Sequence, residues 1–140
     1  MNSISKTDLR IGNVVGIKPT ALHADGCNHL KACFEISELH EDVVFFKGFG
    51  VGEHYKDLNP IEITEEWLSK LGLEQLEDYD TEYSHKDEDV TFIIEYSNHT
   101  ESYHFTGGMS LMFGNGCKYV HQLQNLYFSL TNRELVFDPK

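Results

Sequence analysis

Residues 33–49 read CFEISELHEDVVFFKGF, and this stretch decides the kind of fold that the chain can form. Polar and apolar side chains alternate imperfectly over Cys33–Leu39, and Val43–Phe49 is rich in β-branched and aromatic residues. Both patterns are typical of strands. Residues 40–42 lie between them as a turn, so the stretch predicts an antiparallel hairpin.

A further strand is predicted on the N-terminal side of this hairpin. Residues 8–18 read DLRIGNVVGIK, in which Leu9 and Ile11 share one face and a β-branched run follows Gly12 and Asn13. Strands this closely spaced leave no room for crossover helices. We therefore expect a small antiparallel barrel of SH3-like type in the first sixty residues.

The pattern changes from strand to helix after Asn59-Pro60. Thr64 is a suitable N-cap, two glutamates follow it in the first turn, and Gly72 is a suitable left-handed C-cap. These residues predict a short central helix. We expect Trp67 to lie on its core-facing stripe.

The second half of the chain predicts more strands and a second helix. We expect three strands, at residues 90–96, 102–105 and 109–113, and we expect the sheet to end at residues 114–116 (GNG). An amphipathic helix is predicted at residues 118–130, followed by a last short strand at residues 134–137. The predicted fold class is α+β, with one domain over residues 1–140. Its barrel-like half is 1–60 and its α+β half is 61–140.

The charge of the chain is strongly acidic. Lys and Arg number 11 against 23 Asp and Glu, for a formal net charge of −12. This field disfavours nucleic-acid binding, which depends on basic groups that replace counterions. It favours a basic surface on another protein as a partner.

The most acidic run is residues 74–89, which we expect to be an exposed connection that binds this partner. Phe128 lies on the polar side of the second predicted helix, so it either packs beneath the last strand or marks a contact surface. The candidate partner-binding residues are Glu77, Asp78, Asp80, Glu82, Asp87, Glu88, Asp89 and Phe128.

An alternative function is the binding or sequestering of a small molecule such as a nucleotide signal. Aromatic rings could stack on a base and lysines could hold phosphate. The candidate residues are Tyr55, Tyr103, Tyr119 and Lys118.

Metal or thiol chemistry has weaker support in the sequence. His23, Cys27, His29 and Cys33 are suitable zinc ligands, but their spacing matches no common zinc finger, and we expect no cofactor. Cys117 precedes the second predicted helix and His121 lies one turn on, a possible thiol–imidazole pair that no motif supports.

The composition also bears on the compartment. Residues 1–10 lack the basic start and apolar run of a secretory signal, and no stretch is long enough to span a membrane. Three cysteines without a disulfide pattern fit a reducing environment. We expect a cytoplasmic protein.

Three blocks of the sequence resemble a family. DLRIGNVV at 8–15, NPIEITEEWLSKLGL at 59–73 and KYVHQLQNLYFSLTNRELVF at 118–137 are similar to small uncharacterised proteins of gut bacteria and their phages and prophages. The resemblance covers less than half of the chain and carries over no activity or catalytic residue. It implies a mobile-element context, in which small acidic proteins act by binding host or phage components, including in counter-defence.

Overall fold

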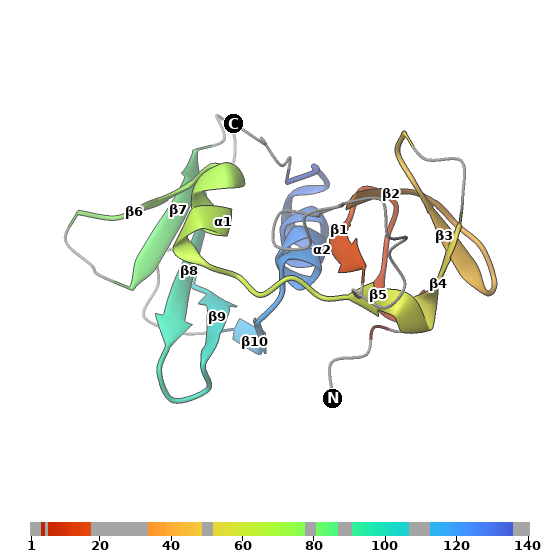
Figure 1. Ribbon diagram of the computed structural model, residues 1–140. Helices are drawn as coiled ribbons and strands as arrows, with labels where there is room; N and C mark the ends of the chain where they lie inside the picture. The colour runs from red at the N-terminus through yellow and green to blue at the C-terminus, as the bar shows by residue number, and fades with distance from the viewer. Residues whose placement is uncertain are drawn as a thin grey trace. The chain divides into compact units, whose positions relative to one another are not determined.

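The computed structural model describes residues 4, 6–17, 34–48, 52–77, 81–86, 91–106 and 113–135. In these residues the chain is α+β, as predicted, with two five-stranded antiparallel sheets and two α-helices (Figure 1). The chain divides into two compact units. The first is Met1–Ile61 with Tyr119–Asn125, and the second is Glu62–Lys118 with Leu126–Lys140.

The first unit contains the predicted hairpin. Its strands are β1 (Val14–Ile17), β2 (Phe34–Leu39), β3 (Val43–Phe46), β4 (Glu53–His54) and β5 (Leu58–Asn59), in the sheet order β4-β3-β2-β1-β5. A short 3-10 helix, η1 (Lys6–Asp8), precedes β1. The turn between β2 and β3 closes with a 2.9 Å hydrogen bond from His40 N–H to the carbonyl of Val43.

The predicted SH3-like barrel is not confirmed, because no sheet is closed. Strands β4 and β5 are the two edges of the first sheet and do not pair with each other. They are nevertheless joined by only three residues, the 3-10 helix η2 (Tyr55–Asp57). From His54 to Leu58 the chain can span at most about 14 Å, whereas five flat strands would place the edges about 19 Å apart. The sheet must therefore curl strongly without closing its hydrogen-bond ladder.

A cluster of apolar side chains forms the core of the first unit. Val15 and Ile36 are fully buried, and Phe46 packs against Phe34 with ring centroids 5.4 Å apart. The remaining members of the cluster are Ile4, Leu9, Ile17, Val44 and Leu58.

The turn that precedes β1 is fixed by its own backbone and by a side chain. Asn13 N–H donates to the carbonyl of Arg10 at 3.0 Å, and Asn13 Oδ1 accepts from the N–H of Arg10 at 2.7 Å. Gly12 has φ 97°, as the third position of a type II turn requires. The sequence GN at 12–13 thus supplies the bend that leads into the first strand.

Helix α2 (Val120–Thr131) places two amide side chains against this turn. Gln124 Oε1 accepts from the N–H of Val14 at 2.8 Å, and Gln124 Nε2 donates to the carbonyl of Gly12 at 3.1 Å. Asn125 Oδ1 accepts from Asn13 Nδ2 at 2.9 Å and from Arg10 Nε at 3.2 Å. Gln124 is 1% exposed, so its amide replaces water for two backbone groups.

Replacing Gln124 with Met keeps the shape of the side chain and removes both hydrogen bonds. We expect Gln124→Met to lower the free energy of unfolding by about 2–4 kcal/mol, because it leaves buried backbone groups unpaired. Urea unfolding followed by circular dichroism measures this. Ser129→Ala, at an exposed position of the same helix, is the control, and a loss no larger than that of the control would contradict the expectation.

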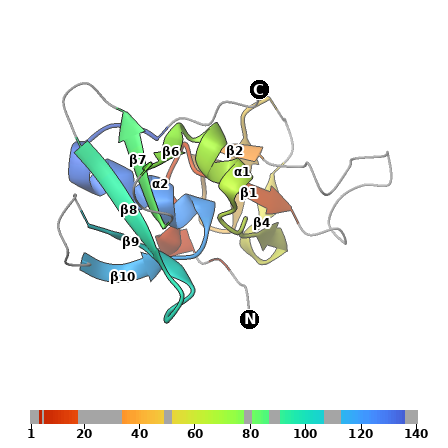
Figure 2. The ribbon, with the colours of Figure 1, turned by 90° about the vertical axis from the view of Figure 1, so that its left-hand side faces the viewer.

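The second unit contains the predicted central helix and a second sheet. Helix α1 (Glu65–Lys70) begins after Thr64, whose Oγ1 accepts from Trp67 N–H at 3.2 Å, and Gly72 follows it with φ 83°. The sheet order is β10-β9-β8-β7-β6 (Figure 2). Its strands are β6 (Leu73–Gln75), β7 (Glu82–Lys86), β8 (Thr91–Ser97), β9 (Ser102–Phe105) and β10 (Phe113–Cys117).

Several expectations for the second half were wrong. The acidic run is not simply a connection, because it contributes β6 and β7 to the sheet. Gly114–Gly116 does not end the sheet, since it lies inside β10, where the register shifts between Phe113 and Cys117. Glu134 and Leu135 are not in a strand, and the rest of that expected strand lies outside the described residues.

Trp67, which we expected on the core-facing stripe of α1, is half-buried, and Lys70 Nζ lies 5.3 Å from its ring centroid.

Helix α2 lies close to its predicted bounds but buries more than its predicted apolar face. His121 and Gln124 are 3% and 1% exposed although the helical pattern places them on the polar side with Phe128, whereas Leu130, on the apolar side, is 48% exposed. Asn132, with φ 59°, ends the helix by donating to the carbonyl of Phe128. No helix among the described residues is long and apolar enough to cross a membrane.

Candidate functional site

The two faces of the second sheet differ in chemistry. Tyr83, Phe92 and Ile94 are buried on one face, together with Leu68 and Leu71 of the α1 region. The opposite face, which we call the polar face, follows from strand alternation and the pairing register. Its members include Glu74, Glu82, Ser84, Glu95, Ser102 and His104.

A row of ionisable side chains crosses the polar face. Glu82 on β7 is directly opposite Glu95 on β8, and Glu95 is directly opposite His104 on β9. Directly opposed side chains have Cβ atoms about 5 Å apart, so two carboxylates in this position repel each other. Neither Glu82 nor Glu95 forms an ion pair with another residue of the described ranges.

Few basic residues are available to neutralise these carboxylates. Strands β6, β8 and β9 contain no Lys or Arg, and β7 has one, Lys86, at its last position. Among the described residues Glu82 and Glu95 therefore have no basic partner, in positions where a neutral pair would be more stable. Such local conflicts with stability are expected at functional positions.

Two hydroxyl groups and an imidazole form a hydrogen-bonded cluster at the end of this row. Thr100 Oγ1 lies 2.7 Å from Ser102 Oγ and 3.0 Å from His104 Nε2. Ser102 Oγ lies 3.1 Å from the same Nε2. Ser102 and His104 are 3% and 8% exposed, whereas Thr100 is exposed in the turn between β8 and β9.

Gly116 on β10 provides the space for this cluster. A Cβ atom at Gly116 would collide with the side chain of Ser102 and would lie 2.9 Å from His104 Nε2. A residue with any side chain would therefore displace the hydroxyl from the imidazole.

The substitution Gly116→Ala tests this packing. We expect it to lower the free energy of unfolding by about 1–3 kcal/mol, as overpacking of a filled site does. The double variant Ser102→Gly/Gly116→Ala moves the side chain from one position to the other, and we expect it to lose less stability than the sum of the two single variants. Additive losses in a double-mutant cycle would refute the proposed close packing.

The cluster can hold and move a proton. Nε2 of a neutral His104 accepts a hydroxyl hydrogen when Nδ1 carries the ring proton. Nδ1 is buried and has no partner among the described residues, and the register places Glu95 on the strand beside it. Ser102 is too buried to meet a ligand, so the accessible member of the cluster is Thr100.

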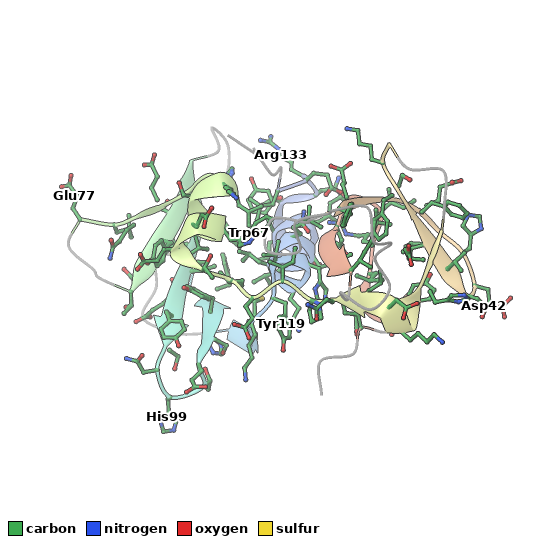
Figure 3. The ribbon with its side chains drawn as sticks, in the orientation of Figure 1. Asp42, Trp67, Glu77, His99, Tyr119 and Arg133 are labelled. Carbon is green, nitrogen blue, oxygen red and sulfur yellow. The ribbon has the colours of Figure 1, made fainter. Side chains whose placement is uncertain are left out.

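The structure describes only part of the predicted partner-binding set. Glu77 is exposed just beyond the end of β6 and points away from the sheet (Figure 3). Glu82 lies in the negative row, and Phe128 is half-buried on α2. The other five carboxylates of the set, Asp78, Asp80, Asp87, Glu88 and Asp89, lie outside the described residues.

The predicted nucleotide-binding residues are divided between the two units. Tyr55 and Tyr119 belong to the first unit, and Tyr103 and Lys118 to the second. Tyr103 is buried, with its ring centroid 5.0 Å from that of Tyr96, and burial raises its pKa to about 12. Its ring is thus part of the core and offers no free face to a base.

The remaining aromatic candidates have partners of their own. Tyr55 donates its hydroxyl hydrogen to the carbonyl of His40 at 2.6 Å, and burial, with a smaller effect of Asp42, raises its pKa. Tyr119 is half-buried and stacks on His121 with ring centroids 6.0 Å apart. Lys118 is exposed.

Metal and thiol sites gain no support. The zinc candidates His23, Cys27, His29 and Cys33 lie outside the described residues, and the described ones contain no group of His, Cys, Asp and Glu that could hold a metal. Cys117 is buried, which raises the pKa of its thiol to about 11. It is therefore a thiol at neutral pH, and not the thiolate that nucleophilic chemistry needs.

His121 is a buried histidine of the first unit. Burial lowers the pKa of His121 below its ordinary value of about 6.5, although the negative charge of Asp8 acts in the opposite direction. Its Nδ1 is buried and has no partner among the described residues.

The stability of the protein should therefore fall in mild acid. The unfolded chain takes up a proton at this histidine near pH 6.5, and the folded chain only at lower pH, so the neutral ring favours folding above pH 6.5 and this advantage is lost as the pH falls. We expect His121→Phe to lose less stability than the wild type between pH 7.5 and pH 5.5. Thermal unfolding at both values measures this.

His99→Gln, which changes an exposed histidine at the tip of the β8–β9 hairpin, is the control (Figure 3). It should keep the wild-type pH dependence. Equal pH dependence of the wild type and His121→Phe would show that His121 does not contribute.

Sequence reasoning did not single out Thr100, Ser102, Glu95 or His104 as site residues. The available signal is the i, i+2 spacing of Ser102 and His104 in a predicted strand, which places both on one face. Pairing with Glu95 and Gly116 depends on the register, which the sequence did not specify.

Comparison with known proteins adds no relative. No protein-family model matches the chain, and no curated protein or solved structure is significantly similar to it.

Proposed function

We propose that this protein acts by binding, and that the polar face of the second sheet engages a basic surface of another protein. The observation that carries the proposal is the direct opposition of Glu82 and Glu95. A basic side chain from a partner that lies between the two carboxylates would replace their repulsion with attraction.

The wider charge distribution supports the same partner class. Glu77 is exposed just beyond the end of β6, and the chain as a whole carries a formal charge of −12. An acidic surface of this kind speeds the approach of a basic partner and repels nucleic acid. The association should therefore weaken as salt screens the charges.

The resemblance to phage- and prophage-associated proteins is the basis for the identity of the partner. We propose a host or phage protein with a basic surface, bound in the cytoplasm of a bacterial cell, with counter-defence as one setting. The basic groove of a DNA-handling enzyme has the required charge, since carboxylates can occupy the positions of phosphates.

Removing the charges of Glu82 and Glu95 should change binding and stability in opposite directions. We expect Glu82→Gln/Glu95→Gln to raise the free energy of unfolding by about 0.2–1 kcal/mol, because it removes a repulsion. We also expect it to weaken the binding of a fluorescent nona-arginine peptide by about threefold or more. Chemical unfolding and fluorescence anisotropy at low salt measure the two effects.

A matched control has the same net charge. Glu41→Gln/Glu62→Gln removes two exposed carboxylates that lie outside the sheets' strands. If this control weakens peptide binding as much as the double variant in the row does, affinity depends on total charge alone, and the polar face is not the binding site.

A further inference from the structure

We propose that Thr100 is a nucleophile that accepts an acyl group from an activated ester or thioester, with His104 as its general base. This inference goes beyond binding and depends on a different part of the polar face. Its central observation is the 3.0 Å distance between Thr100 Oγ1 and His104 Nε2, which is within the reach of direct proton transfer.

Three described hydroxyl groups lie near an imidazole nitrogen: those of Thr100, Ser102 and Tyr127. Ser102 and Tyr127 are buried, so Thr100 is the exposed one. Ser37, Thr64 and Thr131 hydrogen bond to backbone groups through their hydroxyls. Thr100 instead contacts an imidazole nitrogen and a second hydroxyl, in a turn that is exposed to reagents. A backbone partner cannot remove the hydroxyl proton, whereas an imidazole can.

The base is held in place from two sides. Ser102 Oγ lies 3.1 Å from the same Nε2 and 2.7 Å from Thr100 Oγ1, so when Thr100 donates to Nε2, Ser102 can donate to Thr100. The absence of a side chain at Gly116 lets the ring and the Ser102 hydroxyl lie close to β10. His104 is 8% exposed, so bulk water does not compete strongly for Nε2. Positioning of this kind reduces the loss of entropy when a nucleophile and its base react.

The chemistry balances without a further reactant. Thr100 Oγ1 attacks the acyl carbonyl carbon, and Nε2 of His104 takes the hydroxyl proton. The new Oγ1–carbon bond forms as the bond from that carbon to the leaving oxygen or sulfur breaks, and the proton passes from Nε2 to the leaving group. The product is a threonine ester, with His104 restored to its neutral form.

Glu95 is the residue placed to assist the base. It lies directly opposite His104 and on the same face, so it is the neighbouring carboxylate that could accept a hydrogen bond from Nδ1–H. That bond would favour the tautomer whose Nε2 is free to accept the Thr100 proton. Nδ1 makes no other hydrogen bond within the described ranges.

The experiment uses the full chain and 4-nitrophenyl acetate as the acyl donor. Intact mass spectrometry measures the rate of acetylation, and peptide mapping locates the acetyl group. We expect one acetyl group on Thr100 in the wild type, its loss in Thr100→Val, and its return in Thr100→Ser, which restores the hydroxyl. We expect His104→Gln to slow acetylation of this site about a hundredfold, the scale of general-base catalysis.

His99→Gln is the matched control for the histidine, because it lies in the same turn and has no hydroxyl partner among the described residues. It should react at the wild-type rate. Acetylation confined to lysine, tyrosine or the amino terminus would overturn the proposal, as would acetylation of Thr100 at a rate that His104→Gln does not change. Thr100→Val and Thr100→Ser keep the test valid if His104→Gln fails to fold, which circular dichroism reveals.

Discussion

The amide group of Gln124 is the contact on which the first unit depends. This one side chain on α2 accepts a hydrogen bond from the backbone N–H of Val14 and donates one to the carbonyl of Gly12. It thus supplies the hydrogen bonds that a neighbouring strand would otherwise make to these two backbone groups. The bend at Gly12 and Asn13 directs the chain into β1, and β1 joins the hairpin of β2 and β3 to β5. Loss of this amide would leave the central connection of the curled sheet with buried, unpaired polar groups.

The two faces of the second unit's sheet have opposite effects on stability, since one is an apolar core and the other carries groups that reduce the free energy of unfolding. Its apolar face is an ordinary core, in which Tyr127 packs edge-on against Phe92 and near His85. Its polar face keeps two opposed glutamates and a histidine whose Nδ1 is unpaired among the described residues. A fold selected for stability alone would not retain these positions, so the difference between the faces points to a role in recognition or chemistry.

The sequence predicted those parts of the fold that depend on local signals. Thr64 and Gly72 bound α1 as expected, and residues 40–42 form the turn of the hairpin, because capping and turn formation involve neighbouring residues. Strands β6 and β7 were missed because their acidic composition resembles that of a solvated loop. The opposition of Glu82 and Glu95, the space at Gly116 and the burial of Gln124 depend on partners far along the chain, which a single sequence does not reveal.

The hydrogen bond between Val14 and Gln124 joins residues 110 positions apart. A ribosome delivers the chain from its N-terminus, so β1 emerges long before the amide that completes its surroundings. The N–H of Val14 and the carbonyl of Gly12 therefore lack this partner until residue 124 has been made. Helix α2 thus completes a turn near residue 13, and a chain that stops before residue 124 would lack a side-chain partner of the first unit as well as part of the second.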